Sequence, residues 1–178
     1  MAVEIERKFL VFGEDWREQA QGSQRLVQGY LTTPGGGRGR PEKPQPGDAG
    51  AACSVRVRIG GERAWLNIKS AIAGIERREY EYAIPLSDAE RMLDEFCPAR
   101  VEKIRHYVPC ADAMFEVDEF LGDNTGLVVA ELELQSQTDQ FPRPSWLGLE
   151  VSDRPRYYNV NLLQHPYSSW NARERAGE

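Results

Sequence analysis

Hydrophobic and polar residues alternate at a period of two along most of the chain, a pattern that predicts strands rather than helices. In the segment 3–10, Glu4, Glu6 and Lys8 fall on one face of the expected strand, and only Arg7 interrupts the apolar residues of the other face. The same alternation recurs over 53–59, 64–69, 77–82, 101–108, 115–120 and 129–134. The pattern therefore predicts a sheet of many strands, each with one charged face and one apolar face.

Helical periodicity is confined to short segments between the expected strands. Ser87 and Glu90 have the spacing of a capping box that opens the helix LSDAERMLDEF. Its apolar face comprises Ala89, Met92, Leu93 and Phe96. A second helix is expected to begin near Asp153 and to end before His165, and a short one is expected over 15–21.

One segment, 32–52, departs from both patterns because it is rich in glycine and proline, which predicts a flexible loop. Its three consecutive glycines are not followed by Gly-Lys-Ser or Gly-Lys-Thr, so they do not form a phosphate-binding P-loop. With 178 residues and 40% hydrophobic content, the chain is expected to form one domain over 1–178, with 167–178 as a C-terminal tail.

Composition argues against several classes of protein. The formal net charge of -6 disfavours a surface that binds duplex nucleic acid. No apolar run approaches the roughly 20 residues of a membrane-spanning helix and the first residues do not form a secretory signal, so a cytoplasmic location without a membrane partner is expected. Cys53, Cys97 and Cys110 are far apart and form no CxxC pair, which supports neither a disulfide framework nor a zinc site.

The direction of the charged faces decides what they do. For a single strand, the simplest interpretation is the solvent-exposed side of a sheet. Here, however, like charges lie two residues apart in six pairs: Glu4/Glu6, Arg56/Arg58, Glu79/Glu81, Lys103/Arg105, Glu116/Asp118 and Glu131/Glu133. Such neighbours repel each other unless a counter-ion lies between them. If these faces point into a barrel, acidic pairs can share a divalent cation and basic pairs can bind a polyanion.

The sequence EIERK near the amino end resembles the ExExK motif of the CYTH group, also called the triphosphate tunnel metalloenzymes. Seven further motifs follow in the order of that family: QGYL, VRVRI, LNIKS, REYEY, EKIR, FEVDEF and AELEL. The closing segment PSWLGLEVSDRPRYYNVNL is similar to the family segment in which a strand leads to a helix that plugs one tunnel mouth. Within the family, the chain resembles the bacterial members that hydrolyse inorganic tripolyphosphate.

The resemblance implies an α+β fold, in which an eight-stranded antiparallel β-barrel has a charged interior, outer packing helices and a C-terminal plug helix. It also implies hydrolysis of inorganic triphosphate to pyrophosphate and phosphate, with Mg²⁺ or Mn²⁺ as the cofactor. The implied substrate-binding residues are Lys8, Arg56, Arg58, Lys69, Lys103 and Arg105. The implied metal ligands are Glu4, Glu6, Glu131 and Glu133, with Glu79, Glu81, Glu116 and Asp118 as candidates for a second metal. Lys8 and Lys69 are expected to stabilise the leaving pyrophosphate, and Tyr30 to hydrogen-bond a terminal phosphate.

Other functions stay open at this point. The family also contains thiamine triphosphatases and class IV adenylyl cyclases, and another nucleoside or organic triphosphate could be the substrate, although no distinct adenine pocket is visible in the sequence. A non-catalytic polyphosphate-binding module would use the same basic residues, and a purely structural barrel would pair its charges internally. The expected partner is a small-molecule triphosphate, with neither nucleic acid nor membrane, and association into a homodimer is left open.

Overall fold

The structure is a computed structural model that describes residues 2–32, 53–70 and 75–177. The strands in these residues are β1 (Ala2–Val11), β2 (Gly22–Thr32), β3 (Cys53–Gly60), β4 (Arg63–Ser70), β5 (Glu76–Ile84), β6 (Arg100–Cys110), β7 (Ala113–Phe120), β8 (Val128–Leu134) and β9 (Leu147–Glu150). The α-helices are α1 (Trp16–Gln19), α2 (Leu86–Phe96), α3 (Asn159–Leu162) and α4 (Ala172–Arg175), and the 3-10 helices are η1 (Gly122–Asn124), η2 (Pro155–Tyr157) and η3 (Tyr167–Ser169). None of these helices is long and apolar enough to cross a membrane. The predicted loop 32–52 lies outside the described residues, apart from its first residue.

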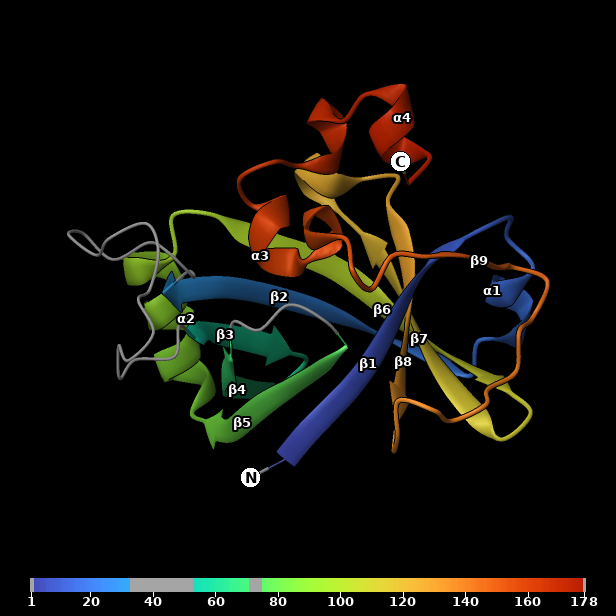
Figure 1. Cartoon of the computed structure of the whole chain (residues 1–178). Coiled ribbons are helices and arrows are strands. Elements are labelled where there is room, and N and C mark those ends of the chain that lie inside the picture. Colours follow the sequence, from blue (N-terminus) through green and yellow to red (C-terminus); the bar gives the residue numbers. More distant parts are fainter. Residues whose placement is uncertain (1, 33–52, 71–74, 178) are drawn as a thin grey trace, which may run out of the picture.

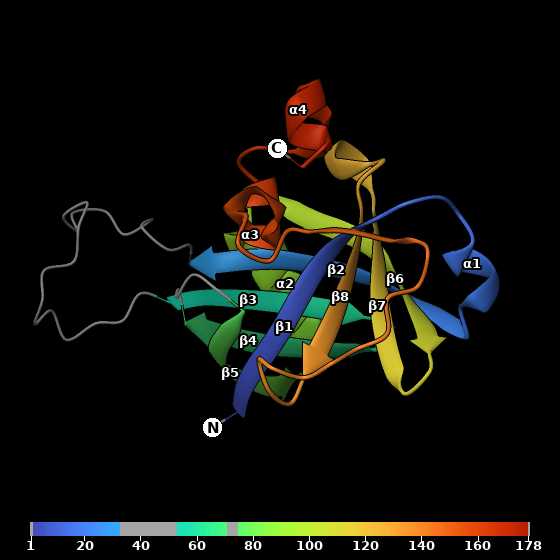
Figure 2. The same ribbon diagram turned by 45° about the vertical axis from the view of Figure 1, so that its right-hand side comes forward.

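Neighbouring strands run antiparallel in the order β5-β4-β3-β2-β6-β7-β8-β1-β9. β1 pairs with β8 from Ile5 to Leu10, and its other edge pairs with β5 over Ala2–Ile5. β1 thus joins the two ends of a curled sheet, and Figures 1 and 2 show the start of β5 beside β1. The predicted antiparallel barrel is confirmed. β9 is an additional short strand that pairs with the far end of β1.

Helix α2 covers the outer faces of β2, β3 and β4. Its residues Ala89 and Leu93 pack with Val57 and Ala64 of the sheet, and with Cys97 just beyond the helix. Removing these apolar side chains from water stabilises the contact between helix and sheet. The expectation that this helix packs outside the barrel is confirmed.

Two details of the predicted α2 are wrong. The helix begins at Leu86, and Pro85 occupies the N-cap position without any side-chain hydrogen bond, so Ser87 does not open a capping box. Pro85 has an extended ψ of 137°, and the helical backbone starts directly after it. Phe96 is 61% exposed, because Cys97, which is 5% exposed, takes the buried place at the end of the apolar face.

A second apolar cluster lies outside β1, β6, β7 and β8. In it, Phe9 and Phe115 pack with Trp16 of α1 and with Trp146, which precedes β9. Phe115 and Trp146 meet edge to face, with their ring centroids 5.2 Å apart. The short helix predicted over 15–21 is therefore present as α1, and it delivers one large side chain to the sheet.

Arg7 is the residue that interrupts the apolar alternation of β1. Its guanidinium donates to the Glu150 carboxylate of β9 at 3.3 Å and to the Gln137 carbonyl at 3.0 Å. The position lies on the outer face beside β9, where a charged partner is within reach. The irregularity in the sequence pattern thus marks the place where an additional strand docks.

The inward faces of the strands are charged over only part of their length. Toward one end of the barrel the same faces carry apolar residues, namely Leu10, Val101, Phe120 and Val129. These residues pack with Tyr157, Leu162 and Trp170 of the C-terminal segment. Figure 1 shows α3 and α4 gathered at this end of the barrel. The C-terminal segment therefore closes the barrel with an apolar plug, whereas the alternation alone predicted only charges inside.

Two short helices, η2 and α3, stand where one continuous helix was predicted between Asp153 and His165. Tyr158 separates them with an extended backbone, at φ -75° and ψ 132°. Its hydroxyl donates to the Ser152 carbonyl at 2.9 Å. The prediction of a single helix is wrong, because the extended backbone of Tyr158 interrupts the helical conformation.

The predicted C-terminal tail contains η3 and α4. The Asn171 side chain accepts from two backbone N–H groups of α4, and Glu174 completes the capping box. Trp170 lies between the two helices, is 4% exposed, and meets Tyr157 edge to face at 5.0 Å. The segment is therefore part of the plug.

A tight contact beneath α2 gives a test of the packing. A Cβ atom on Gly29 of β2 would lie 2.6 Å from the Cys97 Cβ and 2.8 Å from the Leu93 Cδ2. We expect Gly29→Ala to push α2 outward and to lower the free energy of unfolding by about 1 to 3 kcal/mol. Gly22→Ala on the same strand is the control, because no atom lies within 4 Å of its new Cβ. Urea denaturation measures both, and equal effects would contradict this packing.

Candidate active site

The barrel encloses a cavity of about 280 Å³, and each of β1 to β8 contributes to its lining, together with the start of α3. The structure brings 14 of the 15 predicted site residues into this lining: Glu4, Glu6, Lys8, Tyr30, Arg56, Arg58, Lys69, Glu79, Glu81, Lys103, Arg105, Glu116, Glu131 and Glu133. Asp118 is the exception. The alternation predicted this convergence, and the chemical roles of the residues stay predictions.

The charged side chains of the lining differ widely in exposure. The exposed fraction of the side chain is 41% for Glu81 and 2% for Lys103. Glu131, however, is only 6% exposed, and Lys69 at 19% is slightly more exposed than its partner Glu4 at 16%. Acids and bases are therefore interleaved through the depth of the cavity.

Glu131 lies at the centre of the deepest ion-pair network. Its two carboxylate oxygens accept from the Lys8 ammonium and, at 2.5 Å, from the Arg105 guanidinium. Burial by itself raises the pKa of Glu131, but the nearby cations of Lys8, Lys103 and Arg105 hold that pKa well below its usual range. Glu131 is therefore a fixed anion that orients two cations.

Asp118 lies behind the cavity wall and is fully buried. Its carboxylate accepts from the Lys103 ammonium and from two nitrogens of Arg105, each at 2.7 Å. Burial and the Arg105 charge lower the pKa of Lys103, and the Asp118 charge opposes this shift. The structure thus places Asp118 as the buried partner of two cavity cations and not at the cavity surface.

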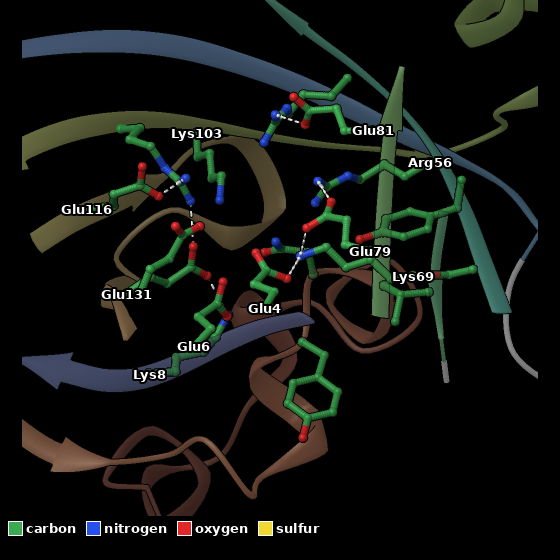
Figure 3. A pocket seen from close by; sticks show the side chains of 18 residues that line it. Glu4, Glu6, Lys8, Arg56, Lys69, Glu79, Glu81, Lys103, Glu116 and Glu131 are labelled. Atoms are coloured by element: carbon green, nitrogen blue, oxygen red, sulfur yellow. Dashed lines mark hydrogen bonds and ion pairs between the residues drawn. The ribbon is translucent and has the colours of Figure 1, made fainter. Parts of the chain in front are cut away.

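A second ion-pair network lies on the other side of the cavity. Lys69 contacts Glu4 at 2.7 Å and Glu79 at 3.2 Å, and Figure 3 shows these three side chains pointing toward one another. Arg58 contacts Glu81 at 2.7 Å. Asn67, which is fully buried, donates to both Glu79 and Glu81. These carboxylates are thereby fixed on the wall of the cavity.

Three acids near the opening lie close enough to repel one another. Glu6 and Glu133 are directly opposite across β1 and β8. Burial raises the pKa of Glu133, and the charges of Glu4 and Glu6 raise it further. Carboxylate oxygens that repel each other suit a hard divalent cation, so their chemistry fits a metal site. Within residues 2–32, 53–70 and 75–177, no three acidic, histidine or cysteine side chains converge as a ready-made ligand set.

Two arginines of the lining each have a buried nitrogen without a hydrogen-bond partner among the described residues. The Nε atoms of Arg56 and Arg58 are buried and make no hydrogen bond within the part of the chain that the structure describes. The two side chains line the cavity from one face of β3. An unpaired buried donor is costly, so these two guanidinium groups are incompletely paired within the described residues.

Several polar residues in and around the site carry no charge and so lie outside the predicted set. Gln28 and Asn67 are fully buried, and both share a strand face with predicted site residues. They follow the same alternation as the charged residues, but without a charge they belong to none of the like-charged pairs. Tyr158 and Asn159 line the cavity from the plug, far along the chain from the barrel strands. No periodic pattern places them there, because they lie at the break between two short helices.

A curled antiparallel sheet that encloses acids and bases from most of its strands defines a class of proteins that bind charged ligands inside a barrel. The chain belongs to the CYTH domain family, whose profile matches residues 2–167. The sequence resemblance to this family is therefore confirmed. Family membership implies a requirement for a divalent metal.

Relatives of known sequence cover nearly the whole chain. An inorganic triphosphatase of Acetivibrio thermocellus is 39% identical over 171 residues, which span 96% of this chain and 99% of the relative. An inorganic triphosphatase of Nitrosomonas europaea is 33% identical and covers 89% of this chain and 95% of its own length. The crystal structure of the inorganic triphosphatase NE1496 has a TM-score of 0.59 and 31% identity, and covers 92% of this chain and 95% of its own.

The central position of Glu131 predicts a pH-dependent loss of stability in Glu131→Gln. The substitution removes one partner from a buried ion-pair network and should lower the free energy of unfolding at pH 7 by about 3 kcal/mol. Because the folded pKa of Glu131 is depressed, its contribution is present above the unfolded value of about 4.3 and is lost as pH falls toward the folded pKa. The difference between wild type and variant should therefore be constant from pH 7 to about pH 5 and should narrow below about pH 4.

Denaturant unfolding at a series of pH values measures this difference. Glu102→Gln is the matched control, because Glu102 is a partly exposed carboxylate that contacts Arg25 on the other face of β6. It should change the free energy of unfolding by less than about 1 kcal/mol. A variant Glu131→Gln as stable as this control would contradict the central role of Glu131.

Proposed function

We propose that the chain hydrolyses inorganic triphosphate to pyrophosphate and phosphate inside the barrel. The observation that carries this proposal is the convergence of six basic residues, from β1, β3, β4 and β6, on one cavity. Both relatives described above are named inorganic triphosphatases, and they match almost the full length of the chain.

The basic residues bind and orient the phosphate groups. Arg56 and Arg58 line the cavity, and guanidinium groups pair well with phosphate oxygens. Lys8 and Lys69 carry the charge that stabilises the leaving pyrophosphate, and the Tyr30 hydroxyl binds a terminal phosphate. Water attacks the terminal phosphorus, the bond from that phosphorus to the bridging oxygen breaks, and pyrophosphate departs.

For the cofactor we propose Mg²⁺ or Mn²⁺. The carboxylates that would hold the ion are Glu4, Glu6 and Glu133 near the opening, with Glu131 deeper in the cavity. Hard oxygen donors suit both ions. When bound, such an ion supplies Lewis-acid polarisation of phosphate oxygens and lowers the pKa of a bound water.

The character of the lining supports an inorganic substrate over an organic triphosphate. Pockets for organic ligands measure roughly 300 to 1,000 Å³ and are mainly apolar. This cavity measures about 280 Å³, and the uncharged residues of its lining are Tyr30, Ser54, Tyr158, Asn159 and Val160. A nucleoside or thiamine group would find little apolar surface on which to pack.

We propose a cytoplasmic location on a separate ground. Cys53, Cys97 and Cys110 are free thiols. Free thiols persist in reducing compartments, whereas secreted domains of this size often oxidise their cysteines to disulfides.

The decisive experiment compares substrates with the purified full-length protein. Tripolyphosphate, ATP and thiamine triphosphate are each incubated with Mg²⁺ or with Mn²⁺, and released phosphate, pyrophosphate and cyclic nucleotide are quantified. We expect phosphate and pyrophosphate in equal amounts from tripolyphosphate, at a rate above that of the organic substrates. Faster turnover of ATP or thiamine triphosphate, or formation of cyclic AMP, would replace the proposal by that activity.

Arg58→Ala tests the phosphate-binding role of the basic residues. A charge-assisted hydrogen bond contributes about 1.5 to 3 kcal/mol, so the affinity for tripolyphosphate should fall by about 10-fold to 150-fold. Arg25→Ala is the control, since Arg25 also pairs with a glutamate but is 65% exposed on the outside of the barrel. Calorimetric titration should give wild-type affinity for Arg25→Ala. If Arg58→Ala binds tripolyphosphate as tightly as the wild type, Arg58 does not contribute to phosphate binding.

A further inference from the structure

The cavity lining is not a simple basic clamp. Seven glutamates and six lysines and arginines form it, so with all groups ionised its net charge is -1. The buried Asp118 behind the wall adds a further negative charge. An inorganic triphosphate brings about four or five more, and charge concentrated away from water is costly unless it is compensated. Triphosphate binding by this lining therefore calls for added positive charge.

The lysines proposed to bind phosphate already form ion pairs with glutamates proposed to bind the cation. Lys69 holds Glu4 at 2.7 Å, and Lys8 holds Glu131. In both pairs the carboxylate oxygen accepts a hydrogen bond from an ammonium group. A divalent cation at that oxygen would lie close to the positive nitrogen, and a phosphate at that nitrogen would lie close to the negative carboxylate. Each ion pair therefore opposes both ligands when either binds alone.

We propose that the cavity couples the binding of triphosphate to the binding of the divalent cation through these ion pairs. Phosphate takes the lysine from a pair and releases the carboxylate to the cation, and the cation takes the carboxylate and releases the lysine to phosphate. The inference rests on the proposed function and deepens it, because it states how each ligand changes the affinity for the other. Coupling of this kind is reciprocal and typically changes affinity by about five- to 150-fold.

The pair of Lys69 and Glu4 is the best place to test the coupling. The two side chains are 19% and 16% exposed, and neither belongs to the apolar cluster of the plug. Glu133 provides the matched comparison, because it lines the same cavity with the same charge. Among the described residues no cation forms a hydrogen bond or ion pair with Glu133, and its pKa is raised by burial and by neighbouring acids.

The first test measures Mn²⁺ alone, with the signal of unbound Mn²⁺ followed by electron paramagnetic resonance. Lys69→Gln releases Glu4 and Glu79, so we expect it to bind Mn²⁺ about fivefold more tightly than wild type, which corresponds to roughly 1 kcal/mol of ion-pair free energy. Arg25→Gln also releases a glutamate, Glu102, but outside the cavity, and should leave Mn²⁺ binding unchanged. Loss of a substrate-binding lysine thus improves cation binding.

The second test measures tripolyphosphate in excess chelator by calorimetry. Glu4→Gln frees Lys69 and should raise the affinity for metal-free tripolyphosphate by about fivefold. Glu133→Gln removes an equal charge without freeing a base, so its increase should be clearly smaller. Thermal melts show whether each variant folds. If Lys69→Gln fails to fold, the comparison of Glu4→Gln with Glu133→Gln still tests the coupling.

The coupling is overturned if Lys69→Gln binds Mn²⁺ no better than wild type, or if Glu4→Gln and Glu133→Gln bind metal-free tripolyphosphate equally well. Hydrolysis of tripolyphosphate by the wild type with Mg²⁺ is measured alongside. If the wild type hydrolyses tripolyphosphate but neither variant gains affinity, the coupling is wrong and the proposed function is supported. If the wild type neither binds nor hydrolyses tripolyphosphate, the proposed function itself is wrong.

Discussion

The pairing of acids with bases inside the barrel is the interaction on which the rest of this structure depends. An unpaired charge away from water costs several kcal/mol, so deeply buried charges are tolerated only when each has a partner. Glu131 is the partner of Lys8 and Arg105. The fully buried Asp118 is the partner of Lys103 and, again, of Arg105. The deepest charges of the barrel therefore form networks of ion pairs.

Turning the charges inward forces the apolar residues outward, and the fold has to cover them. Helix α2 covers one part of the outer surface through Leu93 and Ala89, and Trp16 and Trp146 cover another part. The barrel also needs an apolar anchor inside, because ion pairs by themselves contribute little net stability. The C-terminal segment supplies it with Trp170 and its neighbours at one end. The charged cavity is thus confined to the remainder of the barrel.

The same arrangement explains how one site can serve two oppositely charged ligands. Acids and bases pair with one another around the cavity, so in the proposed coupling a cation and a polyanion each find complementary groups there. Because the lining is close to neutral overall, neither ligand gains from net charge, and the proposed coupling attributes the gain to local exchange of ion-pair partners. A cavity with only bases would bind a phosphate chain more simply, but it would offer no place for the cation that phosphoryl transfer uses.

The sequence by itself determined which residues share a face of each strand, because strand side chains alternate with period two whatever surrounds them. The repeated like-charged pairs and the order of the motifs, which indicates the family, then favoured an inward direction for the face that carries Glu4, Lys69 and Arg105. Only the tertiary structure decided which charge pairs with which, since Lys8 and Glu131 lie 123 residues apart along the chain and meet only where β1 and β8 pair. It also decided that Asp118 lies behind the wall and that the extended backbone of Tyr158 interrupts a helix. The depth of a side chain depends on its position along the barrel, and the end of a helix depends on the local backbone conformation, and no periodic pattern contains either.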